Sequence, residues 1–429
     1  MSTTASGGGQ RHVVVIGAGA VGCASAIEAL RRGLQVTLLE PGEPGGEQAS
    51  SFGNAGWFSS HSVVPPALPG AWRKVPGWLA DPLGPLAVRW GYLPRALPWL
   101  LRYLASGWTE ARVQRIAEAL RTLLADAPAL HRELAREAGV PELVEQHGLL
   151  HVYRSRAEFE SDALAWRVRA RCGVQWEEWA EPELRAREPD LDARYTLGIF
   201  VPEAGHCRQP GAYVAALARH AEHLGARRRA ARATGLRIEG GRLRAVLTDA
   251  GELPADAAVI SAGARSGDLA AQAGTPVPLE SERGYHVVLP GVTAPGPRTP
   301  MMAADGKLIV HAMRDGLRAA GQVEIAGLAA APDWRRAEIL RRHLASMFPA
   351  LDVPPAQVTT WLGHRPSLPD GLPCIGLARG SDDVVLAFGH GHVGLGGSAR
   401  TGRWVARLLA ERRAWPELAP FDPRRFGRG

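Results

Sequence analysis

The sequence predicts an α/β fold in which a Rossmann-like nucleotide-binding domain is interrupted by a second, α+β domain built on a mostly antiparallel sheet. Three observations predict it. A glycine-rich strand–turn–helix unit occupies residues 13–40, several apolar strands follow in the middle of the chain, and a last buried strand at 384–388 leads into a second glycine-rich loop. At 429 residues the chain is also too long for one simple core, which suggests two lobes.

The first unit has the parts of a dinucleotide site in the right order. The β-branched run at 13–16 predicts a buried strand, followed by a helix and a second strand that ends at Glu40. Gly17 allows a tight turn, Gly19 lets the backbone approach a pyrophosphate, and Gly22 lets the helix pack closely on the strand. A carboxylate at Glu40 accepts hydrogen bonds from a ribose 2′-hydroxyl and repels a 2′-phosphate, which favours FAD or NAD over NADP.

The remaining elements follow from periodicity and from turn residues along the chain. Helices are predicted over 109–139, 213–224, 335–347 and 398–412, and strands over 149–153, 196–201, 233–238, 243–248, 257–261, 285–289, 308–312, 322–326 and 384–388. The nucleotide-binding half therefore starts at the N-terminus and finishes at the C-terminus. We expect it to comprise residues 1–75, 200–275 and 362–429, with 76–199 and 276–361 forming the substrate-binding domain.

Composition indicates which classes of binding partner and which cellular compartment to expect. The formal charge is +7, but the arginines are dispersed among acidic residues and no nucleic-acid motif is present, so no nucleic acid is expected. The four cysteines are scattered without CxxC spacing, which indicates neither a zinc site nor a disulfide framework. The first ten residues lack the regions of a signal peptide, and no long apolar run predicts a transmembrane helix. We therefore expect a cytoplasmic protein.

Residues 72–108 form a segment rich in tryptophan, leucine and proline. Its tryptophans are Trp72, Trp78, Trp90, Trp99 and Trp108. One interpretation is an interfacial patch that touches the inner face of a membrane, with tryptophan at the headgroup level. The other is ordinary packing of a helical arm in the substrate-binding domain. The sequence leaves both open, and it does not indicate an oligomeric state.

Four blocks carry a resemblance to a known family. They are VVVIGAGAVG with Glu40, ASSFGNAG at 49–56, ERGYH at 282–286, and RPSLPDGLP at 365–373 together with GHGH at 389–392. Over nearly its whole length the chain resembles the FAD-dependent amino-acid oxidoreductases, a superfamily that includes glycine and sarcosine oxidases, and most closely their D-amino-acid dehydrogenase branch. The resemblance implies a two-lobed fold with a Rossmann-like FAD-binding domain, non-covalently bound FAD, and oxidation of a carbon–nitrogen bond.

The resemblance also implies which residues surround FAD. Ser50 and Ser51 are expected at the pyrophosphate or ribityl chain, with a plain loop cap as the alternative. The glycine-rich loop at 389–397 opens a helix, whose N–H groups and dipole are expected to face the flavin and stabilise its reduced, anionic form. His390 and His392 lack a third ligand at a suitable spacing, so we expect no metal. The full set expected at the cofactor is Gly17, Ala18, Gly19, Ala20, Val21, Gly22, Glu40, Pro41, Ser50, Ser51, Asn54, Ala55, Gly56, Ala233, Ala262, Gly263, Gly389, His390, Gly391, His392, Val393, Gly394 and Leu395.

The resemblance places Arg365 beside the flavin loop of the family pattern, which makes it the best candidate for binding a substrate carboxylate. A guanidinium pairs with a carboxylate bidentately, and Pro366 holds the segment extended; a surface or interlobe salt bridge is the alternative. Tyr285 and His286 lie on one strand, where alternation sends only one of them into a given pocket, and we favour Tyr285. The expected substrate-binding set is Arg365, Tyr285, His286 and Asn54, and the expected catalytic set is Arg365, Tyr285 and His392, with His392 only tuning the site.

The expected reaction is hydride transfer from the α-carbon of a neutral D-amino acid to flavin N5. It gives an imine, which hydrolyses to a 2-oxo acid and, for primary amines, ammonia. The block at 282–286 resembles the branch that acts on cyclic substrates such as D-proline or hydroxy-D-proline, and the sequence leaves the substrate side chain open. Lys74 and Lys307 are the only lysines and neither lies in a flavin-facing motif, which favours a quinone or another non-oxygen acceptor. The alternatives are an oxygen-dependent oxidase of glycine or N-methyl amino acids, a flavin-binding subunit without catalysis, and an NAD-dependent dehydrogenase, against which the second glycine-rich loop argues.

Overall fold

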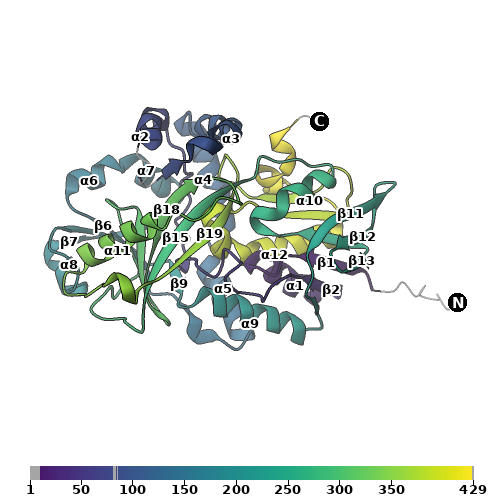
Figure 1. The fold of residues 1–429 in the computed structure, drawn as a ribbon, viewed down its shortest axis with the longest axis horizontal. Coiled ribbons are helices and arrows are strands. Elements are labelled where there is room, and N and C mark those ends of the chain that lie inside the picture. Colours follow the sequence, from purple (N-terminus) through teal and green to yellow (C-terminus); the bar gives the residue numbers. More distant parts are fainter. Residues whose placement is uncertain (1–9, 81–83, 85, 428–429) are drawn as a thin grey trace.

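The computed structural model describes residues 10–80, 84 and 86–427. Within these residues the strands form two large sheets and two small three-stranded ones. The large sheets lie in two lobes side by side (Figure 1). The lobe on the right of that view contains the first and the last strands of the chain, and the lobe on the left is built from the middle of the sequence.

The right-hand lobe is built on what we call the parallel sheet. Its order is β10 (Arg227–Arg229), β2 (Gln35–Leu39), β1 (His12–Ile16), β14 (Ala257–Ile260), β21 (Val384–Phe388) and β20 (Cys374–Leu377). Only β20 runs antiparallel to its neighbour. The first and last segments of the sequence thus share one sheet, with β14 between them.

Both faces of the parallel sheet are covered, and β1 shows why. Val13 and Val15 point into a core with α1 (Ala20–Arg31), α9 (Pro210–His223) and α12 (Gly394–Glu411). Val14 and Ile16 point the other way, against the small sheet of β11 (Ala233–Glu239), β12 (Arg242–Thr248) and β13 (Gly251–Pro254) and against α10 (Ser266–Gln272). Because successive side chains alternate, a strand buried on both faces reads as one continuous apolar run.

The left-hand lobe is built on what we call the large sheet. Its order is β19 (Thr359–Ser367), β15 (Glu280–Pro290), β18 (Gly316–Ile325), β17 (Leu308–Met313), β16 (Met301–Ala303), β6 (Leu149–Tyr153), β8 (Leu197–Val201) and β7 (Glu177–Ala180), and β4 (Leu86–Val88) also pairs with β18. Most pairs are antiparallel, while β16 with β6 and β18 with β4 are parallel. The helix α11 (Arg335–Met347) packs on one face through Leu340 and Leu344. These two sheets confirm the predicted fold class.

A segment that we call the arm covers the top of the molecule in Figure 1. It comprises η1 (Ala71–Lys74), α2 (Val75–Ala80), β4, η2 (Trp90–Tyr92) and α3 (Leu93–Ser106). Trp99 and Tyr103 of α3 face inward and pack with Ile325 of β18. Among the helices of the described residues, none combines the length and the apolarity that a membrane crossing needs.

Two regions differ from the expected organisation. The single helix expected over 109–139 is two, α4 (Glu110–Leu124) and α5 (Ala127–Glu137), because Pro128 in the first turn of α5 has no N–H and its ring clashes with a preceding helical turn. Both helices pack into the core of the parallel-sheet lobe, although we expected them in the other domain. The strand β19 also crosses the expected boundary at residue 362. The division into domains stays a prediction.

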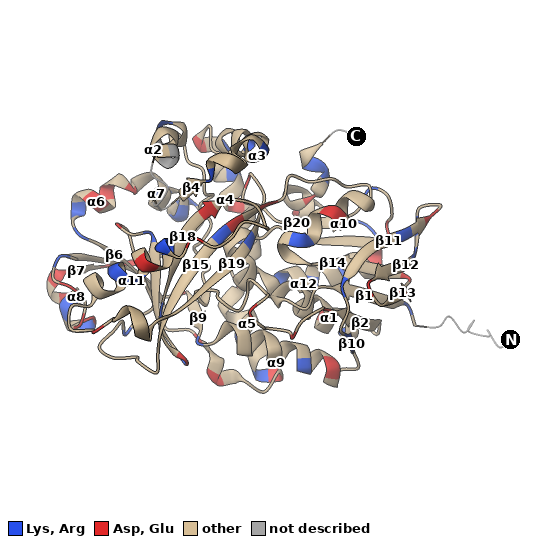
Figure 2. Cartoon of the chain, in the orientation of Figure 1, with Lys and Arg blue, Asp and Glu red and all other residues tan. Residues whose placement is uncertain are grey.

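The other elements are short. They are α6 (Arg156–Ser161), α7 (Ala163–Arg171), α8 (Glu181–Arg187), β3 (Trp57–Phe58), β5 (Val144–Glu145) and β9 (Gly205–Cys207), of which the three strands form the second small sheet. Positively and negatively charged residues are scattered along the elements of both lobes (Figure 2).

Candidate active site

A cavity of about 1140 Å³ lies where the two lobes meet. One wall comes from the carboxyl ends of β1, β2 and β14, which is where open α/β sheets bind ligands. Another wall is one face of the large sheet: His151, Met302, Ile309 and Ala320 lie opposite one another on β6, β16, β17 and β18, and all four line the cavity. The cavity therefore joins a nucleotide-type site to a broad antiparallel surface.

The glycines of the first turn serve three different steric purposes. Gly17 has φ 99°, and a Cβ there would lie 2.7 Å from the carbonyl oxygen of Ser261. A Cβ on Gly22 would lie 1.8 Å from the carbonyl oxygen of Gly17, so α1 meets the turn at a distance that only glycine permits. A Cβ on Gly19 would meet nothing within 4 Å, because this residue faces the open cavity. This geometry fits a ligand that approaches the backbone at Gly19.

Glu40 follows β2 and lines the cavity beside this turn. Its carboxylate accepts hydrogen bonds from the backbone N–H of Ala18 at 3.0 Å and of Gly42 at 3.3 Å. These bonds fix the carboxylate at the cavity wall and leave it lone pairs for hydroxyl donors, as a ribose would supply.

The loop after β2 contributes one unsatisfied polar group. The Oγ atom of Ser51 is buried and has no hydrogen-bond partner among the described residues. Ser50 instead donates its hydroxyl hydrogen to the carbonyl of His364, and the side-chain oxygen of Asn54 accepts the N–H of Gly56 at 2.8 Å. A buried polar atom without a partner is costly, so Ser51 fits a ligand in the cavity, whereas Ser50 and Asn54 hold the loop together.

The second glycine-rich loop closes the cavity from the other end of the chain. Gly389 and Gly391 have φ values of 84° and 55°, and they turn the chain from β21 into α12. No side chain caps the N-terminus of α12, so its first N–H groups and its positive dipole end are available where Val393 to Leu395 line the cavity. This arrangement suits a ligand that carries or gains negative charge.

The two histidines of this loop differ. His390 is buried and its Nε2 lies 2.9 Å from the Oγ1 of Thr401, and burial lowers its pKa to about 3. His392 is exposed to the cavity. Desolvation by the surrounding protein and, to a smaller extent, the positive charge of Arg365 together lower the pKa of His392 to about 4, so the imidazole is neutral near pH 7.

Arg365 lies on β19 at the cavity wall, opposite Glu282 in the sheet register. Its Nη1 donates to the carbonyl oxygen of Gln322 at 2.9 Å, and it forms no ion pair with any carboxylate that the structure describes. Burial lowers its pKa and the Glu282 carboxylate raises it, but a guanidinium stays charged at any physiological pH. The alternative of a salt bridge is therefore not what the structure shows, and the charge is available to an anionic ligand.

Of Tyr285 and His286, only Tyr285 reaches the cavity, as alternation predicts, but its hydroxyl is not free for the role expected of it. Tyr285 reaches the cavity wall, but its hydroxyl donates to Glu324 at 2.6 Å and accepts the N–H of Asp333 at 3.1 Å. Its one hydrogen is thus already used and cannot serve a carboxylate. His286 lies outside the cavity lining, with its ring stacked on Trp361 at 5.1 Å. Burial lowers the pKa of His286 to about 3.

The structure brings most of the expected cofactor residues to one cavity. Its lining includes Gly17, Gly19, Ala20, Val21, Glu40, Pro41, Ser50, Ser51, Asn54, Ala55, Ala233, Ala262, Gly263, His390, Gly391, His392, Val393, Gly394 and Leu395. It does not include Ala18, Gly22, Gly56 and Gly389, which shape the turns behind those residues.

Sequence reasoning missed several residues of the cavity wall. They include Gln322, Trp361, His151, Arg169 and Lys307. Alternation along predicted strands could have indicated the apolar Ile309. No local pattern marks Arg169 or His151. The pairing of β6 with β16 and β8 places His151, and Arg169 lies on α7, where its Nε donates to the carbonyl of His61 at 3.2 Å. Lys307 lines the cavity and pairs with Asp162 at 3.2 Å.

Comparison with known proteins supports this interpretation. The profile of the family described as "FAD dependent oxidoreductase" (DAO) matches residues 12–408. A protein of Bradyrhizobium diazoefficiens named D-amino-acid oxidase is 63% identical over 418 residues, covering 97% of this chain and 99% of that protein. A protein of Paramagnetospirillum magneticum named D-amino acid dehydrogenase is 33% identical over 417 residues, covering 93% of this chain and 95% of that protein.

Solved structures show the same fold. The crystal structure of glycine oxidase from Bacillus cereus superposes with a TM-score of 0.72 at 18% identity, covering 94% of this chain and 98% of that chain. At this level of identity the likeness concerns the fold alone.

Proposed function

Because the chain belongs to the family of FAD-dependent oxidoreductases, we propose that it oxidises the carbon–nitrogen bond of a D-amino acid. FAD is the cofactor of the family, and the orphaned Ser51 hydroxyl, the open side of Gly19 and the carboxylate of Glu40 fit it. The names of the relatives at 63% and 33% identity support the D-amino acid as the substrate class.

The observation that carries the proposal is the free charge of Arg365 at the cavity wall. An amino-acid substrate must present a carboxylate, and a guanidinium without a carboxylate of its own pairs with one bidentately. The rest of the substrate then lies along the face of the large sheet, where Ile309 and Ala320 offer an apolar surface.

The described residues position the substrate rather than react with it. When bound, FAD supplies a two-electron acceptor. Arg365 fixes the substrate carboxylate, and the uncapped N-terminus of α12 stabilises negative charge on the flavin side of the cavity. His392 is neutral near pH 7, so it adds no positive charge beside Arg365. The substrate loses two electrons and two protons to become an imine, which water converts to a 2-oxo acid and ammonia when the amine is primary.

An anaerobic reduction screen tests the proposal. The purified holoenzyme is mixed without oxygen with D- and L-alanine, D-proline, cis-4-hydroxy-D-proline, glycine and sarcosine, and the flavin absorbance is followed. We expect bleaching by D-amino acids, including the cyclic ones, and none by their L-enantiomers. A yellow protein that no amino acid bleaches contradicts the proposal and favours a flavin-binding subunit without catalysis. Release of the flavin on heat denaturation checks that it is bound non-covalently.

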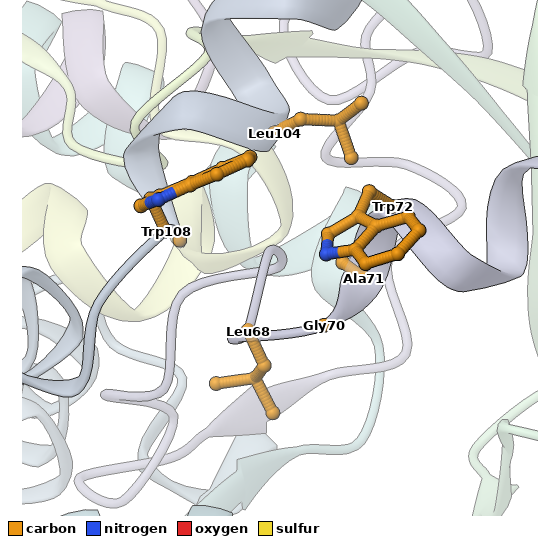
Figure 3. A pocket seen from close by; sticks show the side chains of 7 residues that line it. Leu68, Gly70, Ala71, Trp72, Leu104 and Trp108 are labelled. Carbon is orange, nitrogen blue, oxygen red and sulfur yellow. The ribbon is translucent and has the colours of Figure 1, made fainter.

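For the electron acceptor we propose a quinone, supplied from a membrane surface beside the arm. The arm exposes Trp72, Trp90, Leu97, Leu101 and Trp108, and the last is 64% exposed. Trp72 and Trp108 flank a small outer hollow of about 220 Å³ (Figure 3). Exposed tryptophan and leucine on a helical segment suit the interface of a bilayer.

Charge and position support the same surface. Arg73, Arg95 and Arg102 are exposed and form no ion pair with a described residue, so they are free to meet anionic headgroups. On the inner side of the same helix, Tyr103 lines the cavity. One helix, about 10 Å across, therefore separates the cavity from the exposed surface.

Vesicle binding tests the membrane contact. We expect the holoenzyme to sediment with vesicles that contain phosphatidylglycerol, and the double variant Leu97→Ser, Leu101→Ser to stay in the supernatant with its FAD content unchanged. Equal sedimentation of both proteins contradicts the assigned surface.

Oxygen is the second candidate acceptor, and a specific observation favours it. Lys307 lines the cavity, although no sequence motif predicted it there, and the relative at 63% identity is named an oxidase. Reoxidation of the reduced enzyme separates the two candidates. Rapid return of the yellow colour in air indicates an oxidase, and slow return in air with fast return on adding a soluble quinone indicates a dehydrogenase.

A further inference from the structure

The guanidinium of Arg365 lies directly on the backbone of the neighbouring strand. A Cβ on Gly284 of β15 would lie 2.3 Å from the guanidinium carbon and 2.3 Å from Nη2. Any side chain at this position would occupy the space of the guanidinium. The missing side chain of Gly284 is thus what lets Arg365 cross β15 and reach the cavity.

The strand on the other side of β15 is bulged at the same place. In the register of β15 and β18, Arg283 pairs with Glu324 and Tyr285 pairs with Gly321, so two residues of β18 lie opposite Gly284 alone. Gln322, the first of these two residues, has φ 61°. This left-handed conformation is uncommon for a residue with a side chain and costs free energy in the middle of a strand.

The bulge turns the carbonyl of Gln322 toward Arg365, and this carbonyl accepts the Nη1 hydrogen bond at 2.9 Å. The side chain of Gln322 is held as well, since its Oε1 accepts a hydrogen bond of 2.9 Å from the buried Arg336 of α11. Arg336 also donates to the carbonyl of Gly84, just before β4. Gln322 is therefore fixed through both its backbone and its side chain.

We propose that Gly284 and Gln322 are positioning residues that fix the guanidinium of Arg365 in the orientation that binds the substrate carboxylate. A free arginine side chain samples many rotamers, and ordering it on binding would weaken the substrate complex. Here the hydrogen bond to the Gln322 carbonyl and the space left by the missing side chain of Gly284 restrict the rotamers of Arg365 before the substrate binds. The other N–H groups of Arg365 have no partner in the described residues and stay available to a carboxylate. This proposal rests on the proposed function, in which Arg365 binds the substrate.

Three variants test it through carboxylate binding to the holoenzyme. The probe is propionate, which has the frame of alanine without the amine, and its dissociation constant is read from the change in flavin absorbance. We expect Gly284→Ala to weaken propionate at least tenfold because the methyl group displaces the guanidinium. We expect Gln322→Val to do the same, because a β-branched residue resists a positive φ. The conservative variant Gln322→Asn, which tolerates that conformation, should stay within threefold of the wild type.

A double-variant cycle separates positioning from a general structural effect. If Gly284 acts through Arg365, the loss of kcat/KM caused by Gly284→Ala in the wild type should shrink to less than threefold in the Arg365→Met background. An equally large loss in both backgrounds overturns the proposal. FAD content and thermal midpoints are measured for every variant, and if Gly284→Ala does not fold, the Gln322→Val and Gln322→Asn pair decides.

The outcomes also separate this proposal from the proposed function. If Arg365→Met still binds propionate like the wild type, Arg365 is not the carboxylate site and the proposed function loses its main support. If Arg365→Met loses binding while Gly284→Ala and Gln322→Val keep it, only the positioning proposal fails.

Discussion

The two lobes form their halves of the cavity with different chemistry. At the dinucleotide turn the parallel-sheet lobe presents mainly backbone, namely glycine turns and the N–H groups at the start of α12, with the carboxylate of Glu40 beside them. The large-sheet lobe buries more charged side chains behind its wall of the cavity, and of these Glu282 lines the cavity itself. Of the charged residues that are buried in the described part of the chain, Glu188, Glu282, Arg283, Arg318, Glu324 and Arg336 belong to it, whereas Asp383 belongs to the parallel-sheet lobe.

This difference has a physical reason. A dinucleotide is an extended, anionic molecule, and backbone N–H groups bind it without burying any protein charge. A small amino acid needs a fixed cation beside a flavin, and a buried cation has to be supported by partners and neighbours. A short local motif is enough to encode dinucleotide binding, whereas a binding site for the substrate carboxylate needs residues from several strands.

The largest effect should come from removing Arg365, the cavity cation that we assign to the substrate carboxylate. We expect Arg365→Met to lower kcat/KM for the best D-amino acid about a thousandfold, equivalent to about 4 kcal/mol, because the substrate carboxylate loses its charged partner. Its FAD content should be unchanged, since the cofactor half does not depend on this side chain. Steady-state kinetics measure the change, with the exposed Arg156→Met as a control that should leave kcat/KM unaltered. A loss of less than tenfold would show that the substrate is held elsewhere.

The second test concerns the buried charges of the large sheet. Glu324 accepts Tyr285 and pairs with Arg89 at 2.6 Å and with the buried Arg283 at 3.3 Å. Glu324→Ala leaves Arg283 without compensation, and we expect it to lower the free energy of unfolding by about 3 kcal/mol. Urea denaturation measures this, and Glu178→Ala, which breaks an exposed pair with Arg156, should cost less than about 1 kcal/mol. Equal costs would mean that burial does not set the value of these charges.

The third test addresses the backbone half. Gly22→Ala places a methyl group against the Gly17 carbonyl, and we expect it to destabilise the fold by about 2 kcal/mol and to lower FAD content. Gly19→Ala should leave the unfolding of the FAD-free protein unchanged and weaken only FAD binding, because its Cβ would point into the open cavity. Thermal unfolding with and without FAD distinguishes the two variants, and a destabilised FAD-free Gly19→Ala protein would contradict this assignment.

The last prediction is a dependence of stability on pH that both lobes share and that is absent near pH 7. Burial lowers the pKa of His131 to about 4 in the parallel-sheet lobe and of His286 to about 3 in the large-sheet lobe. Above pH 6.5 these imidazoles are neutral in both the folded and the unfolded chain. Below it the unfolded chain takes up protons that the folded chain does not, so stability should fall between pH 6.5 and 4 by up to about 1.4 kcal/mol per pH unit for each histidine.

Urea denaturation at several pH values measures this slope. His131→Gln should reduce it, and an unchanged slope in that variant would assign the acid sensitivity to other groups.

The sequence predicted the parallel-sheet lobe better than the large-sheet lobe. Local sequence patterns predicted three elements correctly, because each depends on residues that are neighbours in the sequence. They are the turn at Gly17, the strand before Glu40 and the loop before α12. The family resemblance built on those blocks is confirmed by the profile match over residues 12–408. The split of the helix expected over 109–139 was also signalled, since Pro128 is visible in the sequence.

The side-chain contacts and the bulge on the large sheet could not be predicted from local sequence patterns. Alternation indicated that Tyr285 and His286 face opposite ways, but not that Glu324 would take the Tyr285 hydrogen. The bulge at Gln322 leaves no mark in the sequence, because its left-handed backbone follows from the register of β15 and β18.

The sequence by itself thus determined the fold class and the glycine turns at the cavity, since short motifs and periodicity encode them through local contacts. It indicated Arg365 only through the family resemblance. The tertiary structure alone decided how Arg365 is held, which hydroxyls are already satisfied, and which distant residues share the cavity wall. Those features arise from the pairing of strands far apart in the chain, and pairing is settled by packing and register across the whole sheet rather than by any one segment.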